Sequence, residues 1–379
     1  MNAINYNASK DNLPTPPVYE TQLIENSQLK IATYNLFNYL EPPNAFYEFE
    51  RIYSAEQWQK KQRWITEYLR EYQPDIIGFQ EVFSAESLKT LVGTQGYEYF
   101  EVVDQPQIID DFIYKRPVVG IASRYPIVAI KAVQPNTDLI HTLGLTNEFS
   151  FSRKVLRATV DIPHLGYCDC YVVHLKSKRS MIEVDEKKDN NSAEKSIIKN
   201  LKAEVAGRWG SSIQRGSEAA LLMVEIITRR EKTNYPVVLM GDFNNTLTDG
   251  VLNHLLTNDL HFVSSIDRDT YLAKYCLNDA WNLFNNVYMN ELKQSPDSDD
   301  INEQIQKAPQ RAPTHYFNGK GSVLDYILLS SEFDASHHNS LYQVSNYTTY
   351  DKQLINPVFE HDGESTDHGI VMVELALRR

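Results

Sequence analysis

The stretch that decides the fold of this chain is VVLMGDFN, residues 237–244. Its first four residues form an apolar run that is typical of a buried strand. The run leads to a carboxylate, Asp242, and a carboxamide, Asn244, follows two residues later. Because side chains alternate along an extended chain, we expect these two to point to the same side. The stretch therefore predicts a strand that brings two oxygen ligands to the edge of a sheet.

The same arrangement recurs along the whole sequence, because other apolar runs also end in, or contain, acids, amides or histidines. Hard divalent cations prefer carboxylate and amide oxygens, and such cations support hydrolysis. The pattern therefore indicates a metal-dependent hydrolase whose site is assembled from several strands. The strand-edge residues are Asn35, Glu81, His174, Asp242 with Asn244, Asp325, and Asp367 with His368.

Asp325 is the most telling of these residues taken alone, because it lies inside the apolar run VLDYILL, residues 323–329. A carboxylate is costly to bury unless it is paired. A protonatable histidine is the natural partner, and such a pair would keep the imidazole charged and oriented.

The bulk composition sets broad limits on the protein class. The chain has 379 residues, of which 42% are hydrophobic and 23% charged, as in ordinary soluble globular proteins. No apolar stretch approaches the ~20 residues that a membrane span needs, so we expect no span. The N-terminus lacks the pattern of a secretory signal, which favours a cytoplasmic protein. Three cysteines, Cys168, Cys170 and Cys276, fit a reducing compartment, and no second ligand pair suggests a zinc site.

The charge distribution argues against a dedicated duplex-binding protein. The net charge is −13 and the isoelectric point about 5.3, whereas phosphate backbones need a positive face. Residues 174–215 are the exception, with ten Lys or Arg against six acids. This basic segment is either a solvated charged insertion or a rim that steers phosphates. Arg215, at its end, and Glu218, just beyond it, are expected to form a salt bridge on a helix surface, with substrate contact as the alternative.

The order of elements predicts one domain that alternates strands and helices. A helix is expected at residues 54–72, where Ser54 and Gln57 form a capping box, and another at residues 217–230. Residues 1–28 are interpreted as a flexible tail and 29–379 as a single domain with insertions near 178–212 and 290–312. A surface helix is expected within the first insertion and a loop in the second. Strands are expected at residues 30–35, 75–80, 97–103, 118–123, 127–133, 156–162, 167–174, 237–240, 323–329 and 369–375.

A dense aromatic run follows the first expected strand, and packing at the sheet edge is its simplest explanation. A stacking platform for a base or another flat group is the alternative, and this loop is the favoured place for substrate selectivity. The run comprises Tyr34, Phe37, Tyr39, Phe46, Tyr47, Phe49 and Tyr53.

Taken in order, the strand-edge motifs TYNLF (33–37), GFQEV (78–82), VHLKS (173–177), GDFN (241–244), LDYI (324–327) and Asp367-His368 resemble those of the endonuclease/exonuclease/phosphatase superfamily. The resemblance covers residues 29–379. It implies an α/β fold, a four-layer sandwich in which two packed mixed β-sheets are flanked by helices. It also implies cleavage of phosphate esters with Mg²⁺ or Mn²⁺ as the cofactor. On this reading Glu81 is the principal metal carboxylate, aided by Asn35 and Asp367.

The resemblance also implies roles for the remaining residues. Asp242 would orient or deprotonate the attacking water, and Asn244 would hold the scissile phosphate. His174 would donate to a non-bridging oxygen. His368, hydrogen-bonded to Asp325, would be a phosphate contact or an acid–base group.

The substrate class stays open at this point. We expect a phosphodiesterase, either nuclease-like or acting on a small molecule or a lipid headgroup, so the partner is a phosphate ester and possibly nucleic acid. The alternatives are a phosphomonoesterase of inositol or sugar phosphates and a catalytically silent member that only binds. We expect a monomer.

Overall fold

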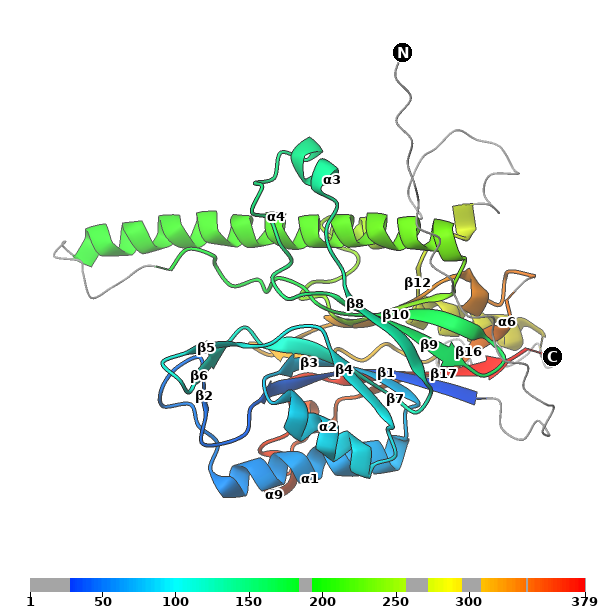
Figure 1. Cartoon of the computed structure of the whole chain (residues 1–379), viewed down its shortest axis with the longest axis horizontal. Coiled ribbons are helices and arrows are strands. Elements are labelled where there is room, and N and C mark those ends of the chain that lie inside the picture. The colour runs from blue at the N-terminus through cyan, green and yellow to red at the C-terminus, as the bar shows by residue number, and fades with distance from the viewer. Residues whose placement is uncertain (1–27, 184–192, 257–271, 295–307, 339, 379) are drawn as a thin grey trace, which may run out of the picture.

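A computed structural model describes residues 28–183, 193–256, 272–294, 308–338 and 340–378. Two six-stranded sheets lie face to face in the middle of the molecule, with helices on the outer face of each (Figure 1). The predicted α/β sandwich of two mixed sheets flanked by helices is confirmed. Among the described helices, none has the length and apolar character that crossing a membrane requires. All of the predicted tail except Gln28 lies outside the described residues.

The first sheet has the order β16-β17-β1-β3-β7-β4. β1 runs parallel to β3, and every other neighbouring pair is antiparallel. The chain's first and last described strands, β1 and β17, are therefore neighbours. The strands are β1 (Gln28–Tyr39), β3 (Ile76–Val82), β4 (Tyr99–Val102), β7 (Val118–Ser123), β16 (Tyr342–Tyr350) and β17 (Ile370–Leu377).

The second sheet has the order β12-β15-β11-β10-β9-β8 and the same plan. Here β10 and β11 are the one parallel pair. The strands are β8 (Ile127–Ala132), β9 (Leu156–Ile162), β10 (Gly166–His174), β11 (Val237–Asp242), β12 (Asn278–Asp279) and β15 (Asp325–Leu329).

Three apolar layers hold the sandwich together, because strands buried on both faces divide their side chains between two of them. In β10, Cys170 and Val172 face the layer between the sheets, while Tyr171 and Val173 face the outer helices. The two sheets pack so closely that a Cβ on Gly78 would lie 3.0 Å from the Met240 side chain. Burial of these side chains is the main stabilising term. Cys168 and Cys170 are buried free thiols in the central layer.

The helix predicted at residues 54–72 is confirmed as α1 (Ala55–Tyr72). Ser54 is its N-cap, and the reciprocal bonds between Ser54 and Gln57 form the expected capping box. Its apolar face packs under the first sheet with α2 (Ala85–Thr94). The short helices are α3 (Thr137–Thr142), α8 (Lys352–Ile355) and α9 (Phe359–Asp362), with 3₁₀ turns at Asn253–Leu255 and Ser331–Phe333.

The helix predicted at residues 217–230 is correct in place but wrong in extent. It is the C-terminal part of α4 (Ala193–Thr233), a continuous helix of 41 residues that also contains much of the first predicted insertion. Figure 1 shows α4 crossing the second sheet and projecting beyond it. Its C-terminal half packs Leu222 and Ile226 on that sheet, whereas Leu201 and Trp209 are exposed. Residues 184–192 lie outside the described part.

The second predicted insertion begins inside a helix, because α6 (Ala280–Gln294) extends through its first residues. Residues 295–307 lie outside the described part. Besides β12 and β16, several strands were not predicted, because they are too short to show a period. They are β2 (Ala45–Phe46), β5 (Gln107–Ile109) and β6 (Ile113–Lys115) in one small sheet, and the hairpin β13 (His315–Phe317) and β14 (Lys320–Ser322).

Candidate active site

Three strands of the second sheet place one polar residue each in a single row. His174 ends β10 and pairs in register with Asp242, which ends β11. Asp242 pairs in turn with Asp325, which begins β15. All three side chains are buried. Asp325 was predicted inside its strand, but it lies at the strand's first residue, where the sheet edge gives it access to the neighbouring site residues.

Gly241 allows this row to form. Its φ is +147°, and a Cβ there would lie 2.0 Å from the Val173 carbonyl oxygen on the neighbouring strand. Only glycine has the required backbone conformation without that clash. The glycine therefore lets β11 approach β10 closely, just before Asp242.

Asp242 and Asn244 are held together by a turn and not by strand alternation. The Asn244 backbone N–H donates to Asp242 Oδ1 at 2.7 Å, and Asn244 has a φ of +53°. Asparagine tolerates this left-handed conformation well. Asp242 and Asn244 thus lie on the same side, as expected, but the turn between them and not strand alternation places them there. The Asn244 amide donates to Leu175 O at 3.0 Å and to Asp242 Oδ2 at 3.2 Å, so it already has protein acceptors.

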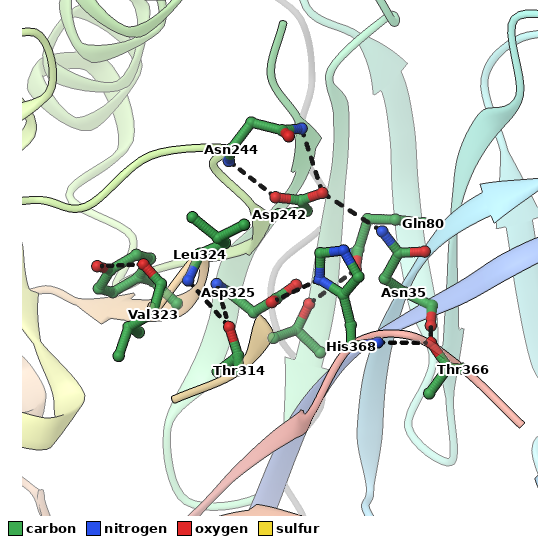
Figure 2. A network of polar contacts seen from close by, with 12 residues as sticks. Asn35, Gln80, Asp242, Asn244, Thr314, Val323, Leu324, Asp325, Thr366 and His368 are labelled. Atoms are coloured by element: carbon green, nitrogen blue, oxygen red, sulfur yellow. Dashed lines mark hydrogen bonds and ion pairs between the residues drawn. The ribbon is translucent and has the colours of Figure 1, made fainter. Parts of the chain in front are cut away.

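Asn35 joins the first sheet to the row on the second sheet. Its Nδ2 donates to Asp242 Oδ2 at 3.3 Å, although the two residues are 207 positions apart (Figure 2). Thr366 Oγ1 donates to the Asn35 carbonyl at 2.6 Å and ties the segment before β17 to the same point. The two sheets therefore meet in one polar network.

Asp325 and His368 form a buried pair, as expected for a carboxylate in an apolar strand, which needs a partner of opposite charge. Asp325 Oδ2 lies 2.8 Å from His368 Nδ1. Thr314 Oγ1 accepts from the Asp325 backbone N–H at 3.1 Å. Burial alone would lower the pKa of His368, but the charge and hydrogen bond of Asp325 raise it well above its usual value. The imidazole is therefore held in its charged form. Asp325 Oδ1 has no partner among the described residues.

His174 has the opposite character. Its Nε2 lies 3.4 Å from Asp242 Oδ2, and its Nδ1 has no partner in the described structure. Burial, together with the positive charges of Arg153 and His368, lowers its pKa well below the usual value. Two buried histidines thus lie beside one row of carboxylates, one neutral and one charged. Burial and Asp325 raise the pKa of Asp242 to about 7, against the lowering effect of His368.

Glu81 lies at the edge of the first sheet in a strained backbone conformation. Its φ is +61°, which a residue with a side chain rarely adopts and which is found most often at functional sites. The Asn38 N–H donates to its Oε2 at 2.9 Å. Burial and the negative charge of Asp367 both raise the pKa of Glu81. Neither the Glu81 nor the Asp367 carboxylate has an ion-pair partner among the described residues.

These carboxylates fit a hard divalent cation. Two acidic groups that repel each other would be stabilised by a cation between them, and the Asn35 carboxamide oxygen adds a donor of the same kind. In the described part, two groups of three acidic or histidine side chains bring their ligand atoms within 4.8 Å of one another: Asp242–Asp325–His368 and His315–Asp367–His368. Both include His368, whose Nδ1 is already engaged by Asp325 at 2.8 Å.

Arg153 lies near the candidate site although no local sequence pattern pointed to it. The predicted surface salt bridge between Arg215 and Glu218 is wrong. Arg153 is half-buried, affects the pKa of both Glu81 and His174, and makes no hydrogen bond or ion pair with another described residue. Arg215 and Glu218 were expected in a surface salt bridge, but both are buried. Glu218 accepts from the Ser152 and Lys176 backbone N–H groups at 2.7 and 2.8 Å.

Arg215 Nη1 donates to the Lys176 carbonyl at 2.9 Å, so this pair of helix residues fixes the loop that follows His174. Burial and the neighbouring charge of Arg153 lower the pKa of Lys176. Burial and Arg215 lower that of Lys178. Lys176 and Lys178, at the start of the basic segment, are therefore crowded by like charges beside His174, which favours the phosphate-steering interpretation for this part of the segment.

A model of the endonuclease/exonuclease/phosphatase family matches residues 32–368. Comparison with curated proteins gives no match. The human Nocturnin catalytic domain with bound sulfate aligns with a TM-score of 0.51 and 16% identity, over 93% of this chain and 95% of that one. An endonuclease/exonuclease/phosphatase from Beutenbergia cavernae aligns with a TM-score of 0.46 and 15% identity, over 92% of this chain and 72% of that one. D. rerio TDP2 complexed with a single-strand DNA product aligns with a TM-score of 0.45 and 13% identity, over 92% of this chain and 99% of that one. At these identities the Nocturnin match supports the fold alone.

Proposed function

Because the chain belongs to the endonuclease/exonuclease/phosphatase family, we propose that it is a Mg²⁺- or Mn²⁺-dependent hydrolase of phosphodiesters. The observation that carries the proposal is the polar network that joins the two sheets through Asn35, Asp242, Asp325 and His368. A network of buried acids and histidines at a sheet edge is expensive to maintain without a function. The residues from 35 to 368 act together, which also supports a single domain.

The metal is assigned to Glu81, Asp367 and the Asn35 carboxamide oxygen. A divalent cation bound there would polarise the phosphate and stabilise charge on the attacking and leaving oxygens. The chain's own residues supply the remaining parts. Asp242, fixed by Asn35 and Asn244, orients the attacking water. This arrangement pre-organises the nucleophile before the substrate enters.

The two histidines take different tasks because their charges differ. Charged His368, held by Asp325, contacts a phosphate oxygen and can supply a proton to the leaving oxygen. Neutral His174 carries a single N–H, and with that proton on Nε2, which lies 3.4 Å from Asp242 Oδ2, it donates to a non-bridging oxygen when substrate is bound. Arg153, which has no protein partner in the described part, adds a positive charge near Glu81 that favours an anionic substrate.

Two separate cavities support a diester over a monoester. One of about 370 Å³ is lined by Ser152, Arg153 and Arg116. Another of about 340 Å³ is lined by Thr366 and Asp367. One lining residue of each cavity, Arg153 and Asp367, influences the pKa of Glu81. A diester has two substituents to place, whereas a monoester has one.

The proposal is tested by the hydrolysis of bis-p-nitrophenyl phosphate, p-nitrophenyl phosphate and plasmid DNA, each with Mg²⁺, Mn²⁺ or EDTA. We expect cleavage of the diester that EDTA abolishes and that Asp242→Asn reduces by at least about a hundredfold. Asp138→Asn, an exposed change on α3, is the matched control and keeps full activity. Diester cleavage that survives EDTA, or that Asp242→Asn leaves intact, contradicts the proposal.

A further inference from the structure

The cavity of about 370 Å³ that Arg153 lines is built from four separate stretches of the chain. Its lining residues lie within 104–107, 116–117, 133–135 and 150–154. Glu81, Asp242 and His368 do not line it, so a group bound in this cavity is not the phosphate at the metal edge. The cavity is therefore a second compartment, and its own lining determines what it binds.

Two of the four charged residues that line this cavity have no partner in the described part of the chain. Lys154 and Asp104 pair with each other, with 2.7 Å between Nζ and Oδ1. Arg116 is exposed and Arg153 half-buried, and neither side chain makes a hydrogen bond or an ion pair with another described residue. A guanidinium has five N–H donors in a planar fork. The cavity therefore has both room and unused donors for a ligand.

The wall that carries Arg153 is fastened to the segment that follows His174. The Ser152 backbone N–H donates to Glu218 Oε1 at 2.7 Å, and the Lys176 backbone N–H donates to Glu218 Oε2 at 2.8 Å. The two oxygens of one carboxylate therefore hold residues 152 and 176 side by side. Burial is the main influence on the pKa of Glu81 and of His174, and the charge of Arg153 acts on both. The cavity thus adjoins the candidate active site.

An anion suits this cavity better than a neutral or a cationic group. Three of the lining charges are positive and one is negative, and Lys154 already engages the negative one. A cation would be repelled by Arg116 and Arg153, and a neutral group would leave both guanidiniums without a charged acceptor. A phosphate or a carboxylate accepts two parallel hydrogen bonds from a guanidinium. The ligand class is therefore an anion with at least two acceptor oxygens.

We propose that the cavity of Arg116 and Arg153 binds a second anionic group of the substrate, carried on one ester substituent of the scissile phosphate. The inference rests on the proposed function, because it assigns that substituent to a place beside the metal edge. Both guanidiniums donate to the oxygens of the second group. Such a group occurs as the terminal phosphate of a small molecule or as the neighbouring phosphate of a nucleic-acid strand, and both have this chemistry.

Titration calorimetry with matched ligands tests the inference without diester turnover. Ethylene glycol bisphosphate is compared with ethyl phosphate, and hexamethylene glycol bisphosphate with hexyl phosphate, each titrated into the full chain at the same free Mg²⁺ concentration. We expect at least one bisphosphate to bind the wild type about tenfold or more tightly than its monophosphate. Two equivalent ends by themselves give a factor of about two. Gains no larger than this factor at both lengths overturn the inference.

Single substitutions show whether the preference comes from this cavity. Arg153→Gln removes the inner charge, and Arg116→Gln removes a charge at an exposed position that folding tolerates more easily. Each is expected to reduce the bisphosphate preference to about threefold or less. Lys115→Gln is the matched control, because it removes the same charge from an exposed neighbour that does not line the cavity. A preference that survives both arginine variants, or that Lys115→Gln lowers equally, overturns the inference.

Hydrolysis separates this inference from the proposed function. A bisphosphate preference in a protein that cleaves no diester supports the cavity and contradicts the proposed function, whereas diester cleavage without the preference contradicts the cavity alone. The thymidine oligonucleotides TpT, pTpT and TpTpT then distinguish the sources of the second anion. Faster cleavage of pTpT than of TpT assigns the cavity to a terminal phosphate. Faster cleavage of TpTpT per bond assigns it to a neighbouring phosphate, and equal rates for all three oppose the inference.

Discussion

Asp325 and His368 form a buried ion pair, with 2.8 Å between Oδ2 and Nδ1, that connects the two sheets of the sandwich. Asp325 begins β15 in the second sheet, and His368 lies two residues before the start of β17 in the first. The pair therefore has two consequences at once. It stabilises the junction between the sheets, and it keeps one histidine charged at the candidate active site.

Removing one partner of this pair is expected to be strongly destabilising. In Asp325→Asn the charged form of His368 loses its counter-ion in a buried site, and such losses cost about 3–5 kcal/mol. We expect the free energy of unfolding, measured with urea, to fall by about that amount and diester hydrolysis to fall with it.

The double variant Asp325→Asn/His368→Asn is the control for this prediction. It has no buried charge left at the pair, so it should be more stable than Asp325→Asn alone while remaining inactive. Additive losses in the double-mutant cycle would show that the two side chains do not interact.

Gly241→Ala is expected to prevent the row His174–Asp242–Asp325 from forming. The added Cβ would lie 2.0 Å from the Val173 carbonyl, at a φ of +147° that alanine does not adopt. We expect a loss of at least about 3 kcal/mol in the free energy of unfolding.

Gly210→Ala is the matched comparison for that change. Gly210 lies within α4, where a Cβ meets the Met181 sulfur at an ordinary 3.5 Å. Alanine should stabilise the helix there by about 0.5–1 kcal/mol. Equal effects of the two substitutions in a thermal melt would contradict the close approach of β10 and β11.

Glu218 is expected to act as a positioning residue. Its carboxylate accepts from the backbone of Ser152 and Lys176, and thereby fixes the segments that carry Arg153 and His174. Glu218→Ala should raise KM for a diester, because the positive groups lose their fixed positions. Glu218→Gln retains one acceptor oxygen and should restore part of the affinity. Unchanged KM in both variants would oppose this role.

Because Lys61 is buried, we expect the free energy of unfolding to rise with pH in the alkaline range. Burial lowers the pKa of Lys61 from its usual 10.5 to about 8. Between these values the unfolded chain binds more protons than the folded one, so the free energy of unfolding increases with pH. From pH 7.5 to 9.5 we expect a rise of about 2 kcal/mol from this group.

Urea unfolding of Lys61→Met over the same range measures this contribution by difference. The variant should lack the rise, whereas Lys60→Met, at the half-buried neighbouring position, should retain it. A wild type and a Lys61→Met protein with parallel pH profiles would contradict the assignment.

Much of the fold could be predicted from local sequence signals. The capping box of Ser54 and Gln57 fixes the start of α1, and buried strands such as β10 and β11 appear as short apolar runs. β16 was missed because its sequence, YQVSNYTTY, mixes polar residues with a bulge between Val344 and Asn346. The full length of α4 was missed because its N-terminal half has no sheet beneath it to impose a regular buried face.

The candidate site was predictable where a polar residue interrupts an apolar run, as Asp242 and Asp325 do. Residues that act through long-range contacts gave no such signal. Glu218 bonds to a backbone group 66 positions away. Arg153 matters because its charge acts on Glu81 and His174. Burial and partnership of this kind depend on the packed structure and not on the local sequence.

The most direct test of the central claim is calorimetric titration of Mg²⁺ into the wild type and Glu81→Gln, with hydrolysis of bis-p-nitrophenyl phosphate measured on the same samples. Loss of the Glu81 charge should weaken Mg²⁺ binding by at least about tenfold, because a carboxylate ligand becomes neutral. Diester cleavage should fall in parallel and recover in part at high Mg²⁺. Unchanged metal affinity and turnover in Glu81→Gln would contradict a metal-dependent phosphodiesterase at this edge of the sandwich.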